Sequence, residues 1–287
     1  MKKYAYYPGC ALTTLASEYD ISFRNLCARM GIELGEVPGW ICCGAAAACS
    51  SSRLLGVALP LKSIALAVEN GYTDIVTPCS ACFYHFKKAL HEMETNPSIR
   101  RDAEDAIGVV FDRPIRVMHP LELFFQHVDL SQWKRAVVRD LSHLKVACYY
   151  GCLLTRPPKV LKFDNPEYPQ TMDKLLRTVG VPTVDWSYKT DCCGAFYASI
   201  NPEVVVDLTH RILENAHGVG ANAFAVGCPI CHLNLDARQA EVEKKYGTKY
   251  QLPVFYFTQL MGAAMGVDES GLGMWRHVVD PQPLMGV

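Results

Sequence analysis

The chain has 287 residues, half of them hydrophobic, which is enough for one large domain or two of ordinary size. A formal net charge of −1 argues against binding nucleic acid or anionic membranes through bulk charge. The most apolar stretch, residues 44–68, is interrupted by Arg53, Pro60 and Lys62, so we expect no membrane span. The first residues show no signal-peptide pattern, and we therefore expect a cytoplasmic protein.

The first half of the chain alternates short apolar runs with longer segments of helical periodicity. Pro8 and Gly9 form a turn after the first run, and Gly71 ends the longest helical segment. We predict strands at residues 3–7, 74–77 and 115–118 and helices at residues 17–30, 50–70 and 81–94. The charged residues 97–113 are expected to form a surface excursion, and residues 129–142 a linker.

The second half repeats this order. We predict strands at residues 145–150, 183–186, 223–226 and 254–257 and helices at residues 170–179, 202–217, 231–246 and 258–265. The last twenty residues are rich in glycine and proline and are expected to be loosely ordered or docked on a partner. Alternating strands and helices predict an α/β fold, in which each half forms a small, mostly parallel sheet with flanking helices.

Thirteen cysteines are more than a reducing cytosol would leave without a role. Without a secretion signal, metal binding or redox chemistry is favoured over a disulfide scaffold. Eight of them form two kinds of short motif, each present twice. Two motifs are adjacent pairs followed by glycine, and two are C-x-x-C pairs: Cys42-Cys43-Gly44, Cys192-Cys193-Gly194, Cys79/Cys82 and Cys228/Cys231.

The spacing of the motifs reveals an internal duplication. In each half a lone cysteine precedes the adjacent pair, and the C-x-x-C pair follows. We therefore expect two pseudo-symmetric lobes, residues 1–140 and residues 141–287, the second including the C-terminal tail. The five thiols of the first lobe are Cys10, Cys42, Cys43, Cys79 and Cys82. Those of the second lobe are Cys152, Cys192, Cys193, Cys228 and Cys231.

Five thiols in each lobe point to a metal centre at the ends of strands, where open α/β sheets bind ligands. Adjacent cysteines pair poorly with each other, but a sharp loop lets both sulfurs face one metal centre. A C-x-x-C at a helix start places thiols near the positive end of the helix dipole, which favours the thiolate. Five thiolates exceed the four of a tetrahedral zinc site and suit a multinuclear iron–sulfur centre. Two zinc sites, each with a spare thiol, and a thiol–disulfide exchanger remain as alternatives.

The duplicated cysteine pattern resembles the CCG-domain family, in particular the B-type component of heterodisulfide reductase and its bacterial relatives. Sequence around the cysteines carries the same resemblance over nearly the whole chain. The similar stretches are Pro38-Gly39-Trp40-Ile41-Cys42-Cys43-Gly44, Arg156-Pro157-Pro158, Phe163-Asp164-Asn165-Pro166-Glu167, Cys228-Pro229-Ile230-Cys231-His232-Leu233-Asn234-Leu235-Asp236 and Pro253-Val254-Phe255-Tyr256-Phe257-Thr258-Gln259-Leu260.

The resemblance implies two noncubane [4Fe-4S] clusters, one held by the five cysteines of each lobe. It also implies a substrate, the disulfide of coenzyme M and coenzyme B, which the family cleaves between the two clusters. The implied partners are a ferredoxin-like [4Fe-4S] subunit of the C type and a flavin subunit of the A type, which a hydrogenase or dehydrogenase can join. No nucleic acid partner is implied.

We therefore predict the catalytic iron–sulfur subunit of a heterodisulfide-reductase-like complex, an oxidoreductase that reduces a disulfide by successive one-electron transfers. Iron could bind the sulfur released after the first electron, as a Lewis acid does elsewhere. One alternative is an electron-relay CCG subunit of another dehydrogenase or quinone-linked complex. A second is a zinc-stabilised interaction module without catalysis.

The remaining candidate residues carry weaker predictions. Cys27 and Cys148 are expected to be buried apolar thiols, and Cys49 is expected to lie beside a cluster without binding it. Three histidines follow or precede motif elements, with either structural or functional roles: His85, His119 and His232. Three basic residues either neutralise an anionic substrate or cluster or form a solvated loop: Arg156, Lys159 and Lys162. Three aromatic residues are expected to shield the clusters from water: Trp40, Trp186 and Tyr197.

Overall fold

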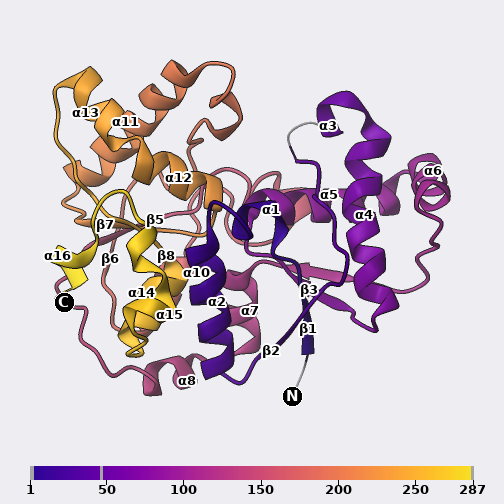
Figure 1. The fold of residues 1–287 in the computed structure, drawn as a ribbon, viewed down its shortest axis with the longest axis horizontal. Helices are drawn as coiled ribbons and strands as arrows, with labels where there is room; N and C mark the ends of the chain where they lie inside the picture. The colour runs from indigo at the N-terminus through magenta and orange to yellow at the C-terminus, as the bar shows by residue number, and fades with distance from the viewer. Residues whose placement is uncertain (1–2, 46–47, 286–287) are drawn as a thin grey trace.

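The computed structural model describes residues 3–45 and 48–285. It contains two four-stranded sheets, each entirely parallel and flanked by helices, which confirms the predicted α/β fold with two similar lobes (Figure 1). The first sheet has the order β2-β1-β3-β4, with β1 Lys3–Tyr6, β2 Glu33–Glu36, β3 Asp74–Val76 and β4 Arg116–Met118. The second has the order β6-β5-β7-β8, with β5 Val146–Tyr149, β6 Thr183–Val184, β7 Ala223–Val226 and β8 Val254–Tyr256.

The register of the two central strand pairs determines where the cysteine motifs lie. Tyr6 of β1 pairs with Val76 of β3, and Tyr149 of β5 pairs with Val226 of β7. The strands are parallel, so both members of each pair end at the same edge of the sheet. In each lobe the lone cysteine and the C-x-x-C pair therefore follow neighbouring strands at the same edge of the sheet.

Within the part of the chain that the structure describes, seven helices precede the connection between the two lobes. They are α1 Gly9–Leu12, α2 Ser17–Arg29, α3 Ala48–Ser51, α4 Arg53–Glu69, α5 Ser80–Thr95, α6 Pro97–Ile107 and α7 Pro120–His127. The helix predicted at residues 50–70 begins at Arg53, because the Ser52 side chain caps α4 by accepting from the Leu55 amide. Residues 97–113 lie at the surface, as predicted, but they contain a helix that was not predicted, α6, which Asn96 caps and Gly108 ends.

The rest of the chain contains more short helices than the periodicity indicates. They are α8 Leu130–Arg135, α9 Pro158–Leu161, α10 Thr171–Thr178, α11 Pro202–Gly218, α12 Pro229–Ala237, α13 Gln239–Tyr246, α14 Phe257–Ala264, α15 Glu269–Leu272 and α16 Gln282–Met285. Two 3-10 turns, η1 Ala195–Tyr197 and η2 Met274–Arg276, join them. The single helix predicted at residues 231–246 is interrupted at Arg238, and the linker predicted at residues 129–142 contains α8.

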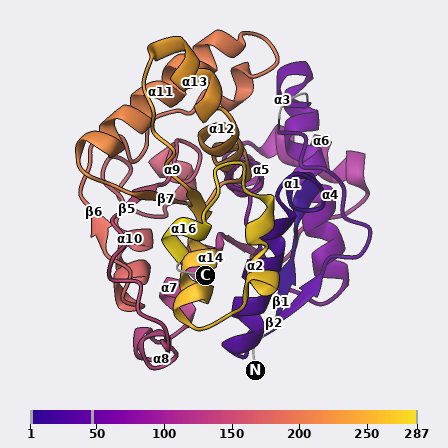
Figure 2. The same ribbon diagram turned by 60° about the vertical axis from the view of Figure 1, so that its left-hand side comes forward.

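The C-terminal segment is docked on the first half, so the prediction of a loose tail is wrong as far as Met285. Asn25 of α2 donates to the Gly271 carbonyl over 2.8 Å, and Arg276 forms an ion pair with Glu18 over 3.0 Å. The rings of Tyr19 and Tyr256 stack with centroids 4.2 Å apart. Figure 2 shows this yellow segment running beside α2. The two halves therefore share one core, and among the described residues no helix is long and apolar enough to cross a membrane.

Candidate metal centre built from two groups of thiols

All thirteen cysteines are free thiols, and five of them converge at the strand ends of the first sheet. We call Cys10, Cys42, Cys43, Cys79 and Cys82 the first thiol group. The sulfurs of Cys43 and Cys82 lie 3.3 Å apart, and those of Cys10 and Cys42 lie 3.9 Å apart. Cys79 is hydrogen-bonded to Cys82, which connects the remaining member.

The second thiol group consists of Cys152, Cys192, Cys193, Cys228 and Cys231. The sulfurs of Cys193 and Cys231 lie 3.7 Å apart, and hydrogen bonds link Cys152 with Cys192 and Cys228 with Cys231. The structure thus brings together the same five thiols in each lobe that the spacing grouped. Metal binding by them stays a prediction.

A tyrosine fixes each adjacent cysteine pair from the neighbouring central strand. The Tyr7 hydroxyl donates to the Ile41 carbonyl over 2.8 Å, and the Tyr149 hydroxyl donates to the Asp191 carbonyl over 2.6 Å. In both lobes this carbonyl belongs to the residue directly before the cysteine pair. The duplication therefore preserved the contact that positions the loop.

The glycine after each cysteine pair brings its amide onto sulfur. The Gly44 amide donates to Cys42 Sγ over 3.5 Å, and the Gly194 amide donates to Cys192 Sγ over 3.3 Å. Both glycines have positive φ, +70° and +76°, which other residues adopt only with strain. Amide donors aimed at sulfur stabilise a thiolate, which is the form that binds metal.

A second pair of glycines makes room for the sulfur of each C-x-x-C. Gly9 and Gly151 have φ of +69° and +66°, directly before the lone cysteines. A Cβ added at Gly9 would lie 3.1 Å from Cys82 Sγ, and one at Gly151 only 2.9 Å from Cys231 Sγ. A side chain at Gly151 would thus force Cys231 Sγ to move, and one at Gly9 would press on Cys82 Sγ.

The C-x-x-C pairs begin helices α5 and α12, where backbone amides lack partners within the helix. A hydrogen bond from Cys231, with further bonds from backbone amides, lowers the pKa of Cys228 to about 6. A hydrogen bond from Cys152 lowers the pKa of Cys192 to about 6 as well.

Other thiols in the same groups hold their protons more tightly. Burial, followed by the charge of Cys42, raises the pKa of Cys10 to about 11. Hydrogen bonds to Cys43 and Cys79, together with burial, raise the pKa of Cys82. Converging thiols cannot all ionise together unless a cation compensates their charge. Each donor set therefore fits a centre of several metal ions, which would be held by its five thiolates.

His119 joins the two lobes beneath the thiol groups. Its Nε2 lies 2.9 Å from both the Pro78 and Gly227 carbonyls, which directly precede the C-x-x-C pairs. Its Nδ1 accepts from the Leu121 amide and caps α7, so the proton is on Nε2 and the ring is neutral. Of the two roles left open for His119, the structure shows the structural one, since the ring is fully buried with both nitrogens in use.

A cavity of about 660 Å³ lies between the two lobes beside the thiol groups. Its walls include Ala45 after the first cysteine pair, Phe196 after the second, and Leu153 after Cys152. The polar residues on its walls are Cys49, Ser50, Tyr84, His85, Lys88 and Ser199. Sequence spacing could not indicate this cavity, because it forms only where the lobes face each other.

His85 and Cys49 form a polar contact in that cavity. His85 Nδ1 lies 3.3 Å from Cys49 Sγ. Burial, followed by the charge of Lys88, lowers the pKa of His85 to about 4, so its ring is neutral at pH 7. Cys27 and Cys148 are buried in the core, as predicted.

A buried ion pair that sequence reasoning missed supports the second thiol group. Lys189 Nζ lies 2.9 Å from Asp173, with both side chains fully buried, and Tyr150 donates to the same carboxylate over 2.8 Å. The amides of Tyr150 and Gly151 donate to the Lys189 carbonyl. No signal marks this pair, because a lysine in a loop is normally exposed.

The basic residues after Cys152 have structural or exposed positions. Arg156 pairs with Glu167 over 2.6 Å and donates to the Thr190 hydroxyl over 2.9 Å, so it holds the second cysteine loop. Lys159 and Lys162 are exposed.

The three aromatic residues expected to shield the thiols differ in their burial. Trp186 is buried and Trp40 packs on Tyr7. Tyr197 is 52% exposed, so the shielding prediction is wrong for that residue.

His232 is buried within α12 and stacks on the Tyr256 ring, with centroids 4.4 Å apart. Its Nε2 has no hydrogen-bond partner in the described part of the chain, so no contact with cysteine sulfur is made through that atom. A functional role in which His232 donates a hydrogen bond from Nε2 to cysteine sulfur is therefore not observed.

Comparisons with known proteins agree with this duplicated arrangement. The CCG family, described as a cysteine-rich domain, matches residues 4–87 and 146–236. The chain is 30% identical over 285 residues to the 8-methylmenaquinol:fumarate reductase membrane anchor subunit of Wolinella succinogenes, covering 99% of each chain. It is 28% identical over 286 residues to the B subunit of the ferredoxin:CoB-CoM heterodisulfide reductase of Methanosarcina mazei, covering 97% of this chain and 94% of that one.

A solved structure of a hypothetical protein from Helicobacter pylori shares the fold, with a TM-score of 0.78 and 14% identity. The likeness covers 97% of this chain but 52% of that one, so this chain spans about half its length. From the two matched repeats and the relatives of similar length, we conclude that the chain belongs to the CCG family of cysteine-rich domain proteins.

Proposed function

We propose that this protein is an iron–sulfur subunit of a multi-subunit oxidoreductase, with one noncubane [4Fe-4S] cluster held by each thiol group. The observation that carries the proposal is the convergence of five free thiols at equivalent strand ends in both lobes. Five sulfur donors exceed the four of a zinc site. Amides aimed at Cys42 and Cys192 sulfurs, together with mostly buried surroundings, suit an anionic iron–sulfur centre.

The reaction that we propose is the reduction of a small-molecule disulfide of the coenzyme M–coenzyme B type. Two electrons and two protons convert the disulfide into two thiols, and the clusters would supply the electrons one at a time. The cavity between the lobes is the proposed binding place, because residues next to both thiol groups form its walls. There the Lys88 ammonium would attract an anionic substrate, beside the apolar side chains of Phe196 and Ile200. A relative whose name describes the B component of a CoB-CoM heterodisulfide reductase supports this choice.

The proposed partners are a ferredoxin-like [4Fe-4S] subunit of the C type and a flavin subunit of the A type. We propose a cytoplasmic location and lobes at residues 1–140 and 141–287. The docked tail means that the second lobe also contributes to the core of the first.

A second candidate is an electron relay in a quinone-linked complex. The specific observation in its favour is the relative whose name describes a membrane anchor subunit of 8-methylmenaquinol:fumarate reductase. Both candidates require the clusters, and they differ in the electron acceptor. Oxidation of a reduced viologen by a disulfide, with no response to a quinone, favours the reductase over the relay.

The test is the iron and acid-labile sulfide content of anaerobically prepared protein, followed by paramagnetic resonance spectra with and without a disulfide. We expect two clusters per chain and a spectrum that changes when coenzyme M–coenzyme B disulfide is added. Colourless protein containing only zinc contradicts the cluster proposal. Clusters whose spectrum never responds to a disulfide contradict the reductase and leave the relay.

A further inference from the structure

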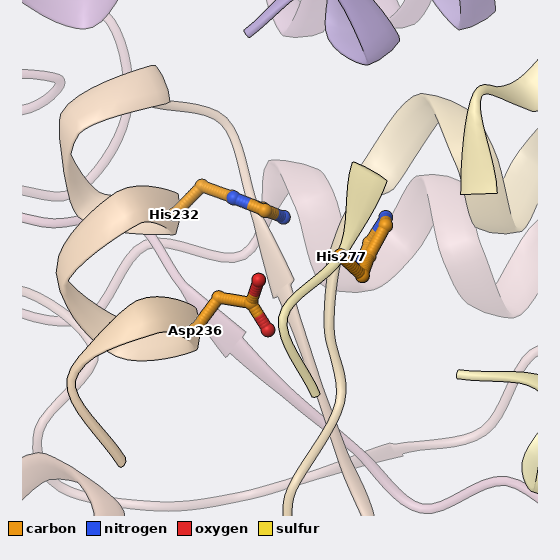
Figure 3. A group of neighbouring side chains, drawn as sticks. All are labelled: His232, Asp236 and His277. Atoms are coloured by element: carbon orange, nitrogen blue, oxygen red, sulfur yellow. The ribbon is translucent and has the colours of Figure 1, made fainter. Parts of the chain in front are cut away.

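Three ligand-type side chains outside both thiol groups face one another near the C-terminus. His232 and Asp236 lie one turn apart on α12, and His277 approaches them from the segment after η2 (Figure 3). Their ligand atoms all lie within 4.8 Å of one another. The rings of His232 and His277 are nearly perpendicular, with centroids 5.0 Å apart.

Two nitrogens in this cluster lack the partners that buried polar atoms normally have. Within residues 3–45 and 48–285, His232 Nε2 and His277 Nδ1 are inaccessible to water and make no hydrogen bond of ordinary geometry, although the Val254 backbone lies close to both histidines. His232 is only 5% exposed, and Figure 3 shows its ring extending toward His277. A hydrogen-bond network among the three residues would have given these nitrogens partners.

The carboxylate in the cluster lacks a countercharge. Asp236 is 2% exposed and accepts from the Val278 and Val279 amides over 2.7 and 3.1 Å. No lysine or arginine in the described residues forms an ion pair with it. Burial accordingly raises the pKa of Asp236 to about 6. A cation at this position would compensate the buried negative charge.

Together these observations point to a ligand set that no other part of the molecule uses. We propose that His232, Asp236 and His277 bind one divalent metal ion of the zinc class, separate from the two thiol groups. Two imidazole nitrogens and one carboxylate oxygen are ligands that zinc accepts at about 2.0–2.2 Å, with water in the fourth position. Tetrahedral ligands at that range lie about 3.3–3.6 Å apart, so the three side chains close by about 1 Å around the ion.

Gln259 sets the condition under which His277 binds. Its Nε2 lies 2.9 Å from His277 Nε2, which therefore serves as an acceptor in this structure. Binding through Nδ1 moves the proton to Nε2 and gives up the hydrogen bond from Gln259, because the Tyr256 amide and the Leu272 carbonyl hold the Gln259 amide in its present orientation. Metal binding therefore has to replace this hydrogen bond.

An ion can reach this site from solvent, and its binding would connect two parts of the fold. Asp236, Val278 and Val279 also border a surface cavity of about 680 Å³, through which an ion can enter. α12 carries Cys231, and the segment holding His277 is tied to α2 through the Arg276–Glu18 pair. The ion would therefore fasten the second thiol group's helix to the tail and, through it, to the first half.

The test uses cluster-loaded protein given zinc chloride and then dialysed against metal-free buffer. We expect about one zinc per chain, with X-ray absorption showing nitrogen and oxygen neighbours at about 2.0–2.2 Å. His277→Gln should lose this zinc while its iron content stays unchanged. His210→Gln, which alters a histidine outside the cluster, should retain it. The iron measurement keeps a failure of the proposed function distinguishable from a failure of this site.

Either of two results overturns the proposal: wild-type protein that retains no zinc, or zinc surrounded only by sulfur at about 2.3 Å, which marks binding by the thiols. Asp236→Asn is a less clean test, because Asp236 also holds the Val278 and Val279 amides. If that variant fails to fold, His277→Gln and His232→Gln still decide the matter.

Discussion

The two lobes use the same contacts at their thiols but differ in what surrounds them. In both, a tyrosine hydroxyl holds the carbonyl before the cysteine pair, and a glycine packs against the last sulfur of the C-x-x-C. Around these contacts the lobes diverge. Cys10 and Cys42 of the first group are both exposed, whereas Cys192 alone is exposed in the second. The contacts that touch sulfur are thus the part that the duplication kept.

The second thiol group also has supports for which the first shows no counterpart in the described residues. The buried Lys189–Asp173 pair lies behind its lone cysteine, and the docked tail packs beside α12. The first group is instead open on the side of Cys10 and Cys42. We infer that the first site is the more accessible to a partner or to solvent, and the second is the more rigid. The predictions below test this difference, from the largest expected effect to the smallest.

Removing a single ligand thiol should affect only the cluster of its own lobe. We expect Cys82→Ala and Cys231→Ala each to lose about half of the iron, because the groups use separate ligands. Iron and acid-labile sulfide content, with paramagnetic resonance, measures this. Cys27→Ala, which alters a buried thiol outside both groups, should retain all the iron. Complete loss of iron in either variant would show that the two sites depend on each other.

Breaking the buried ion pair should destabilise the protein strongly. Asp173→Asn leaves the Lys189 ammonium buried without its countercharge, which costs about 3–5 kcal/mol. In a thermal unfolding scan this should lower Tm by roughly 6–10 °C. As a control, Lys245→Ala removes an exposed ion pair with Asp207, which solvent screens, and should leave Tm nearly unchanged. Equal losses in the two variants would mean that Lys189 does not depend on its partner.

His119 should make the junction between the lobes sensitive to acid. Burial lowers its pKa to about 4, whereas in the unfolded chain it is near 6.5. The unfolded state therefore binds the proton more readily. Above pH 6.5 His119 is neutral in both states and does not lower the free energy of unfolding. This free energy falls as the pH drops from 6.5 to 4, by about 3 kcal/mol in total.

His119→Gln keeps a side-chain donor for the Gly227 carbonyl but does not titrate. Urea unfolding at pH 7 and pH 4.5 should show a smaller pH dependence for this variant than for wild type. His91→Gln is measured at both pH values as a control. Any acid effect shared by wild type and the two variants can then be subtracted. An unchanged pH dependence in His119→Gln would assign the acid sensitivity to other groups.

The glycine before Cys152 should show the smallest effect. Gly151→Ala costs about 1–2 kcal/mol in backbone strain and pushes Cys231 Sγ aside. Gly180→Ala is the matched control, since Gly180 has φ of +78° and nothing near its Cβ position. We expect similar losses of stability but a changed cluster spectrum only in Gly151→Ala. Identical spectra for the two variants would mean that Cys231 tolerates the methyl group.

Most of the sheet could be predicted from local pattern. Short apolar runs located seven of the eight strands, and the cysteine spacing grouped the thiols that the structure brings together. β2 was missed because its sequence, Glu33 to Glu36, has an edge-strand composition with charged ends. α6 was missed because its charges indicated only a surface segment, although Asn96 and Gly108 are good caps. The docked tail was missed because its partners on α2 are more than 200 residues away.

The sequence by itself determined which atoms form the thiol groups, because parallel strands carry their following residues to one edge of the sheet. Tertiary structure alone decided how the groups are supported and what lies between them. The His119 bridge, the Lys189–Asp173 pair, the cavity with Lys88 and the His232–Asp236–His277 cluster each join residues far apart in the chain. Short-range periodicity contains no information about such pairs, since they meet only after burial of the shared core has brought the lobes together.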